Sequence, residues 1–254
     1  EKKREMDRRL IRTRISHLKA ELRAVVKHRE VQRKQRQRNH MPVVCIVGYT
    51  NAGKSTLLNY YTDAGVLEEN QLFATLDPTT KNVLLDSGQT ILMTDTVGFI
   101  RKLPHHLVDA FKSTLEEAKY SNLIVHVVDA SNSQKDKQME AVYETLEQLG
   151  AKDSTVITAF NKMDLVEEDE ILKDPMAEAV VKISGKTGEG TDILLDVIEQ
   201  MLQKQKLYLE KLYEYNEAGK IQIIRNHGQL IKEEYRDDGI YIEAYIPKEI
   251  LGVI

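Results

Sequence analysis

The chain has 254 residues, of which 41% are hydrophobic, so it is long enough to bury at least one large core. Its formal net charge is −4, but residues 1–40 carry 15 Lys or Arg and 5 Asp or Glu, against 21 and 35 in the rest. This asymmetry predicts a basic arm, residues 1–40, that meets an anionic partner. The single cysteine, Cys45, excludes a disulfide framework, and no apolar run approaches the ~18 residues of a membrane span. We therefore expect a cytoplasmic protein without membrane association.

The arm has neither Gly nor Pro in residues 1–38, which predicts one long helix. Its apolar residues follow a spacing that is typical of a coiled-coil seam: Ile11, Ile15, Leu18, Leu22 and Val25. The partner of this seam is either an upstream segment or another helix, and we favour a monomer over a helix-mediated dimer. Five basic residues beyond the seam are expected to contact phosphates, with a merely solvated face as the alternative: Arg29, Arg33, Lys34, Arg36 and Arg38.

Residues 41–205 alternate between predicted strands and helices, which favours an α/β domain with a mostly parallel six-stranded sheet. The strands are expected at 43–48, 82–86, 90–95, 123–129, 155–160 and 179–183. The helices are expected at 54–61, 105–119, 134–149, 166–173 and 189–204. A hairpin turn at Ser87-Gly88-Gln89 predicts one antiparallel edge strand. Residues 63–80 lack periodicity and predict a long functional loop.

Residues 206–254 predict a separate, small α+β domain. A strand is expected at 206–213, followed by a short helix that Asn216 caps and that ends before Gly228. Two further strands, 230–235 and 240–246, are expected to pair across a turn at residues 237–239.

A phosphate loop is the clearest motif in the chain: Gly48-Tyr49-Thr50-Asn51-Ala52-Gly53-Lys54-Ser55. It lies between a predicted buried strand and a predicted helix that begins with Ser55-Thr56, the context in which such a loop binds phosphates. Its backbone N–H groups are expected to surround the phosphate oxygens, and Lys54 to reach the β- and γ-phosphates. The Ser55 hydroxyl is expected to bind Mg²⁺. A turn that merely links strand to helix is the alternative.

Two further motifs predict a switch that senses the γ-phosphate. Asp95-Thr96-Val97-Gly98 follows a predicted strand, so its aspartate would hold Mg²⁺ through water and its glycine N–H would meet the γ-phosphate. The long loop contains Phe73-Ala74-Thr75-Leu76-Asp77, in which the threonine hydroxyl would complete the metal shell. The expected catalytic residues are Lys54, Thr75 and Gly98.

Two motifs at later strand ends predict that the base is guanine. In Asn161-Lys162-Met163-Asp164 the aspartate would accept hydrogen bonds from the ring N–H and the amine of guanine. In Ser184-Gly185-Lys186 the backbone N–H groups would donate to the guanine O6, where adenine presents donors of its own. Five motifs in this order, each at a strand end, leave little room for coincidence.

With these motifs the chain resembles the HflX family of ribosome-associated GTPases. The resemblance extends to Phe-Ala-Thr-Leu-Asp-Pro-Thr-Thr-Lys at residues 73–81, to Asp-Thr-Val-Gly-Phe-Ile at 95–100, and to Leu-Pro-His-His-Leu-Val-Asp-Ala-Phe-Lys-Ser-Thr-Leu-Glu-Glu at 103–117. The basic helix with Asp-Arg-Arg-Leu-Ile at 7–11 resembles the second half of the family's helical linker, and the N-terminal domain of the family is absent. Gly185 stands where the family often has alanine, which is expected to be harmless because the backbone makes the contact.

The resemblance implies a Ras-like phosphate-loop GTPase domain, with GTP or GDP and Mg²⁺ as ligands. It also implies binding to the large ribosomal subunit and its rRNA, without DNA, and a role in splitting stalled or stressed ribosomes. The alternatives are a GTPase of ribosome assembly or tRNA modification, and an RNA-binding scaffold with negligible turnover. The predicted domains are residues 1–40, 41–205 and 206–254.

Four other residues near these motifs each allow more than one role. Phe99 stands where many related GTPases carry the glutamine that positions water, which predicts slow intrinsic hydrolysis, with simple packing of Phe99 as the alternative. Asn51 matches a potassium ligand of some GTPases, with a loop-stabilising amide as the alternative. For His105 and His106, helix-start packing or partner contact is favoured over catalysis.

Overall fold

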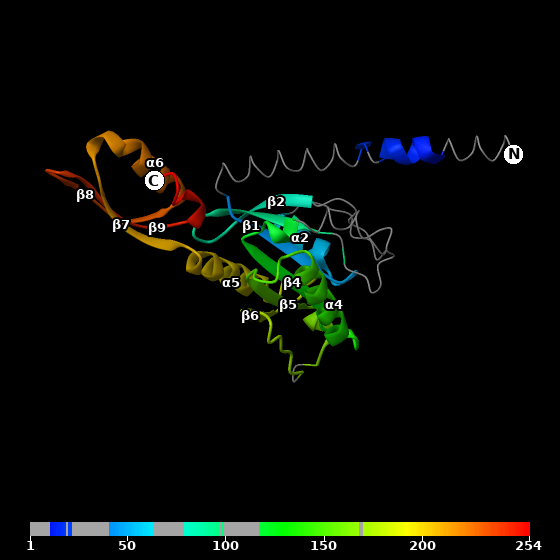
Figure 1. Cartoon of the computed structure of the whole chain (residues 1–254). Coiled ribbons are helices and arrows are strands. Elements are labelled where there is room, and N and C mark those ends of the chain that lie inside the picture. Colours follow the sequence, from blue (N-terminus) through cyan, green and yellow to red (C-terminus); the bar gives the residue numbers. More distant parts are fainter. Residues whose placement is uncertain are drawn as a thin grey trace. The chain divides into compact units, whose positions relative to one another are not determined.

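The computed structural model describes residues 11–18, 20, 21, 41–62, 79–96, 98, 117–167 and 170–254 (Figure 1). The chain divides into two compact units, residues 1–40 and residues 41–254. In the first unit the described residues are helical, as predicted, and the seam residues Ile11, Ile15 and Leu18 are exposed. The remaining seam residues and the five phosphate-contact candidates of the arm lie outside the described residues.

The second unit contains a six-stranded sheet of order β2-β3-β1-β4-β5-β6. Its strands are β1 (Val43–Gly48), β2 (Thr79–Leu84), β3 (Thr90–Asp95), β4 (Leu123–Asp129), β5 (Val156–Asn161) and β6 (Ala179–Lys182). Strand β2 is antiparallel to β3, and the other neighbouring pairs are parallel. The predicted fold class, a mostly parallel sheet with one antiparallel edge strand, is confirmed.

Strand β2 begins three residues earlier than predicted. Its ladder with β3 runs from the pair Thr79–Asp95 to the pair Leu84–Thr90. The hydroxyls of Thr80 and Thr94 lie 2.9 Å apart in this ladder. Pairing with β3 therefore extends β2 to residues 79–81, which the local sequence pattern did not identify as strand.

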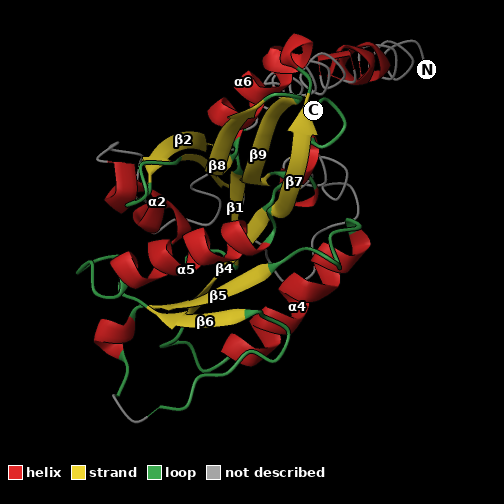
Figure 2. Cartoon of the chain, turned by 90° about the vertical axis from the view of Figure 1, so that its left-hand side faces the viewer, coloured by secondary structure: helices red, strands yellow, loops and turns green. Residues whose placement is uncertain are grey.

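In the part of the chain that the structure describes, three helices cover the sheet: α2 (Lys54–Thr62), α4 (Lys135–Gln148) and α5 (Thr191–Lys204). Figure 2 shows α4 and α5 on opposite sides of strands β4, β5 and β6. Among the described residues, no helix is both long and apolar enough to cross a membrane. Of the helix predicted at 105–119, only residues 117–119 are described, and they are helical.

The helix predicted at 166–173 was wrong. A single turn of 3-10 helix, η1 (Met163–Leu165), is followed by extended and irregular backbone in the described residues 166, 167 and 170–173. Side-chain contacts determine the path of this segment instead: Lys135 pairs with Glu170, and Lys182 Nζ donates to the Glu170 carbonyl. The carboxylate of Asp174 accepts the hydroxyls of Tyr143 and Thr158.

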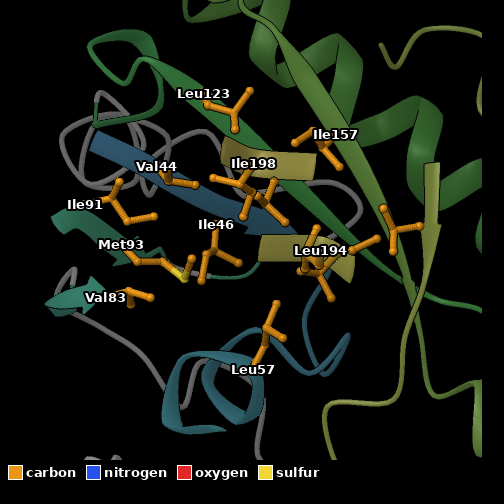
Figure 3. Close-up of a cluster of buried hydrophobic side chains, with 14 of the residues drawn as sticks. Val44, Ile46, Leu57, Val83, Ile91, Met93, Leu123, Ile157, Leu194 and Ile198 are labelled. Carbon is orange, nitrogen blue, oxygen red and sulfur yellow. The ribbon is translucent and has the colours of Figure 1, made fainter. Parts of the chain in front are cut away.

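Buried side chains alternate between the two faces of the sheet, because successive residues of a strand point to opposite sides. On one face, Val44 and Ile46 of β1 pack with Leu57 of α2 and with Leu194 and Ile198 of α5 (Figure 3). The other face carries Cys45, Val47 and Ile124 against Val142 and Leu146 of α4. Both faces are covered, as is typical of parallel sheets, so the strand ends are the part left for ligands.

A second sheet follows α5, with order β7-β9-β8 and antiparallel pairing throughout. It consists of β7 (Leu207–Tyr213), β8 (Gln229–Arg236) and β9 (Gly239–Ile246), accompanied by α6 (Ala218–His227) and the short turns η2 (Tyr215–Glu217) and η3 (Lys248–Ile250). The sheet has its own core with α6, which includes Ile221, Ile224 and Ile242.

Asn216 does not cap the helical segment before Gly228, so this prediction was wrong. The N-cap of helix α6 is Glu217, which makes no side-chain cap hydrogen bond. Glu214 caps the preceding turn η2: its side chain accepts from the backbone of Glu217, whose carboxylate in turn accepts the Glu214 N–H. The amide of Asn216 donates to Glu214. The reciprocal capping box satisfies two backbone donors, and one Asn side chain satisfies fewer.

Candidate functional site

The predicted phosphate loop connects β1 to α2 and has a tightly constrained backbone. Gly53 has a φ of 95° and Asn51 has a φ of 63°, the left-handed region that side chains usually avoid. Gly48 has a φ of 153°, and a Cβ atom there would lie 2.2 Å from the carbonyl oxygen of Val127. Helix α2 begins at Lys54, so its N-terminal N–H groups belong to the loop. The loop thus has the curled backbone and the helix terminus that phosphate binding requires.

Lys54 curls back over this loop and is 6% exposed. Its Nζ donates to the carbonyl oxygen of Tyr49 at 3.1 Å. Burial lowers the pKa of the Lys54 ammonium, and the nearby Asp95 carboxylate acts in the opposite direction. A buried ammonium that donates to one carbonyl and lies in the field of a carboxylate is suited to receive a phosphate oxygen.

A hydroxyl and a carboxylate meet beside Lys54. Ser55 Oγ donates to Asp95 Oδ2 at 2.6 Å, although the two residues are 40 positions apart in the sequence. They meet because β1 pairs in parallel with β3, with Ile46 opposite Asp95. The neighbouring Thr96 Oγ1 donates to the carbonyl oxygen of Ile46 at 2.8 Å and holds the strand end. Such oxygen donors fit Mg²⁺, which prefers few protein ligands together with phosphate and water oxygens.

Gly98 lies directly against the phosphate loop. A Cβ atom at this position would lie 2.8 Å from Thr50 Cα and 3.0 Å from Lys54 Nζ. The structure therefore places Gly98 beside Lys54, the residue that is expected to bind the γ-phosphate. The predicted residues Val97, Phe99, His105 and His106, and the segment Phe73–Asp77 with Thr75, lie outside the described residues.

Asn161 links the phosphate loop to the last predicted motif. Its side chain is 2% exposed, and its Nδ2 donates to the carbonyl oxygen of Ala52 at 2.8 Å. Its Oδ1 accepts the Gly185 N–H at 2.8 Å. The Gly185 N–H, expected from sequence to meet the guanine O6, therefore already has a protein partner. A Cβ at Gly53 would lie 2.2 Å from Asn161 Nδ2, so this link depends on glycine there.

Asp164 and Ser184 approach each other at the end of β5 and β6. Ser184 Oγ donates to Asp164 Oδ1 at 2.8 Å and accepts the Thr187 N–H at 3.2 Å. In the part of the chain that the structure describes, the second carboxylate oxygen of Asp164 has no hydrogen-bond partner. The residue is exposed, as is Lys186. One carboxylate oxygen is thus oriented by serine while the other remains available.

Sequence reasoning missed one residue of this region, Asp129 at the end of β4. Its Oδ2 accepts the ammonium of Lys162 at 2.7 Å. Its position after an apolar strand, next to the strand that carries Asn161, was the available signal. Met163 packs against the nearby apolar cluster of Val128 and Phe160.

The described motif residues therefore converge at the carboxyl ends of β1, β3, β5 and β6, the usual location of ligand sites in open α/β sheets. The sequence comparisons agree with this geometry. The family described as "50S ribosome-binding GTPase" matches residues 43–162.

Three relatives are named GTPase HflX. The protein from Lacrimispora saccharolytica is 63% identical over 99% of this chain and 60% of its own length. The protein from Caldanaerobacter subterraneus subsp. tengcongensis is 44% identical over 98% of this chain and 58% of its own length. The protein from Escherichia coli is 44% identical over 78% of this chain and 47% of its own length. The chain thus spans about three fifths of the first two relatives.

A solved structure is also similar: the crystal structure of a GTP-binding protein from Sulfolobus solfataricus in complex with GDP. It has a TM-score of 0.52 and 30% identity, over 63% of this chain and 52% of that chain. With almost all of its residues aligned to HflX proteins, and with the phosphate loop, Asp95 and Asn161 converging at one sheet edge, the chain belongs to the HflX family of GTPases.

Proposed function

We propose that this chain binds GTP with Mg²⁺, hydrolyses it slowly, and acts as a nucleotide-controlled switch on the large ribosomal subunit. The observation that carries the proposal is the hydrogen bond between Ser55 and Asp95, beside the buried ammonium of Lys54. These groups supply a metal-binding hydroxyl, a carboxylate and a phosphate-binding cation within one corner of the sheet. Thr75, together with water held by Asp95, would complete the Mg²⁺ shell.

Guanine selectivity is proposed to come from Asp164. Its available carboxylate oxygen and its serine-oriented one suit the two N–H groups that guanine presents, while adenine would leave the carboxylate without donors. The Gly185 N–H contributes once a base approaches, by sharing its hydrogen between Asn161 Oδ1 and the guanine O6.

Slow intrinsic hydrolysis is proposed from Phe99, which follows Gly98 and has no group that positions water. In related switches a missing catalytic group lowers the rate by about 10³- to 10⁵-fold. The ribosome is proposed to compensate for the missing group. GTP then favours the bound state and hydrolysis releases the protein, because only the γ-phosphate holds the switch segments.

Ribosome association is supported by the matched family, which is described as ribosome-binding, and by the composition of the arm. The arm carries 15 basic against 5 acidic residues, a balance that suits rRNA phosphates. We also propose that the bound protein splits stalled or stressed ribosomes.

The proposed domains of the chain are the basic arm at 1–40, a GTP-binding domain at 41–205 and a small α+β domain at 206–254.

Single-turnover hydrolysis with and without large subunits tests the proposal. The free protein is expected to bind GTP and hydrolyse it slowly. Large subunits are expected to raise the rate by at least about tenfold, a small part of the roughly 10³- to 10⁵-fold that a missing catalytic group can supply. Ser55→Ala should abolish the stimulated reaction, while Ser133→Ala, at an exposed serine away from the site, should not change it. Equal rates with and without subunits would contradict activation by the ribosome, and no turnover even with subunits would favour a scaffold.

Co-sedimentation separates binding from turnover. The protein should pellet with large subunits in the presence of a non-hydrolysable GTP analogue and remain in the supernatant with GDP. Intact ribosomes incubated with the protein and the analogue should yield free subunits in a sucrose gradient. Binding that is the same with GDP and with the analogue would remove the nucleotide control, and unchanged ribosome peaks would remove the splitting activity.

A further inference from the structure

Asp129 at the end of β4 uses its two carboxylate oxygens for two different purposes. Oδ1 accepts the Ser131 N–H at 3.1 Å and the Ser131 hydroxyl at 2.6 Å, which fixes the turn that follows the strand. Oδ2 accepts the ammonium of Lys162 at 2.7 Å. The side chains of Asp129 and Lys162 are 14% and 25% exposed, so this ion pair is largely shielded from water.

Lys162 lies in the turn between β5 and η1, next to the expected guanine-binding residues, and has an unusual backbone conformation. Its φ and ψ are 66° and 35°, a left-handed conformation that costs energy for any residue with a Cβ atom. It directly follows Asn161, which is bound to the phosphate loop, and it precedes Asp164 by two positions. The ion pair with Asp129 therefore holds the ammonium of Lys162 at the end of β4, while the Lys162 backbone lies in the turn between Asn161 and Asp164.

We propose that Asp129 is a positioning residue for guanine nucleotide binding, which acts by holding the Lys162 side chain as an ordered wall of the base site. The inference rests on the proposed function, because it concerns the base that Asp164 is expected to read. Lysine methylene groups cover apolar surface while the charged end stays solvated or paired, so an anchored stem offers a flat apolar contact to a purine ring. An unanchored lysine would have to be ordered by the nucleotide itself.

The size of the effect follows from the entropy of the lysine side chain. Ordering a free Lys side chain reduces affinity by about 5- to 30-fold, and the Asp129 anchor removes this penalty before the nucleotide arrives. Loss of the Asp129–Lys162 ion pair should lower the affinities for GDP and for a non-hydrolysable GTP analogue by the same factor, because both ligands carry the same base. Binding of tripolyphosphate, which has no base, should not change.

Asp129→Asn is a suitable probe because asparagine keeps one acceptor oxygen for the turn at Ser131 and loses the charge that holds Lys162. The matched control is Glu170→Gln, which removes the Lys135–Glu170 ion pair at 2.5 Å elsewhere on the same domain. Calorimetric titration of the full chain with GDP, the analogue and Mg²⁺-tripolyphosphate gives the affinities. Lys162→Ala and the double variant with Asp129→Asn complete a double-mutant cycle.

The expected result is a loss of about 5- to 30-fold for GDP and for the analogue in Asp129→Asn, with unchanged tripolyphosphate binding. In the double variant, Asp129→Asn should add nothing to the loss caused by Lys162→Ala. Wild-type GDP affinity in Asp129→Asn would overturn the positioning role, as would additive losses or a parallel loss of tripolyphosphate binding. If the wild-type protein binds no guanine nucleotide, the proposed function fails together with the inference; a failure confined to Asp129→Asn leaves the proposed function intact.

Discussion

Acid should destabilise this protein through His126, a histidine in the middle of β4. The side chain is 1% exposed, and its ring meets the Tyr143 ring edge to face, with centroids 5.3 Å apart. Among the described residues, its Nδ1 has no hydrogen-bond partner. Burial lowers the pKa of His126 from 6.5 to about 4, and Lys54 adds to this, while Asp174 acts in the opposite direction.

The magnitude follows from the two pKa values. Between pH 6.5 and about pH 4 the unfolded chain binds a proton at His126 and the folded chain does not, so the free energy of unfolding falls as the pH falls. At about 1.4 kcal/mol per pH unit, the complete effect is about 3 kcal/mol, of which about 2 kcal/mol is lost by pH 5. At that pH most carboxylates are still ionised, so the histidine contribution can be isolated.

Urea unfolding followed by far-ultraviolet circular dichroism, at pH 7.5 and pH 5.0, measures this difference; the chain has no tryptophan for fluorescence. The His126→Phe variant keeps a ring against Tyr143 and should lose about 2 kcal/mol less than the wild type between the two pH values. His17→Gln, at a side chain that is 66% exposed, is the control and should retain the wild-type pH dependence. The same pH-dependent loss in wild type and His126→Phe would refute the reasoning.

Three further perturbations test the proposed ligands. Asp164→Asn should weaken the binding of GTP by about 2–4 kcal/mol and favour xanthosine triphosphate, which presents a carbonyl in place of the amine. Unchanged GTP affinity in the folded variant would contradict the assignment of guanine as the base. If Asn51 binds potassium, replacing K⁺ by Na⁺ should slow GTP hydrolysis in the wild type but not in Asn51→Gly. Glycine is chosen because it adopts the left-handed backbone of Asn51 and lacks the side-chain amide. The same response to Na⁺ in both proteins would indicate that the amide only stabilises the loop. Replacing the five basic residues of the arm beyond the seam by Gln should flatten the salt dependence of ribosome binding by about one unit of logarithmic slope per lost phosphate contact, and equal slopes would exclude these contacts.

The sequence by itself determined most strands and the order of the motifs. Strands β1, β3 and β4 have the predicted bounds, β5 is shifted by one residue at both ends, and β6 ends one residue earlier than predicted. These segments are short, apolar and bounded by turn residues, so local pattern is sufficient to identify them. The phosphate loop can also be identified from local sequence, because its glycines and lysine need only an adjacent strand and helix to form the motif.

The tertiary structure decided which of these residues meet. Ser55 reaches Asp95 because β1 lies beside β3, and Asn161 reaches Ala52 and Gly185 from a strand two places away from β1. Asp129 and Lys162 meet because β4 and β5 end side by side. Side-chain pairs of this kind depend on strand order and register, which periodicity along the chain does not encode.

Local pattern also failed where side chains compete for the backbone. The segment 166–173 is held by Lys135, Lys182 and the buried Asp174 in place of helical hydrogen bonds. Asn216 does not cap α6, because it lies within the turn η2 that Glu214 caps, and Glu217 occupies the N-cap position of α6. The propensity of a short polar segment is worth only tenths of a kcal/mol per residue, roughly, so a few long-range hydrogen bonds are enough to override it. Those bonds exist only once the strands that supply their partners have been packed together.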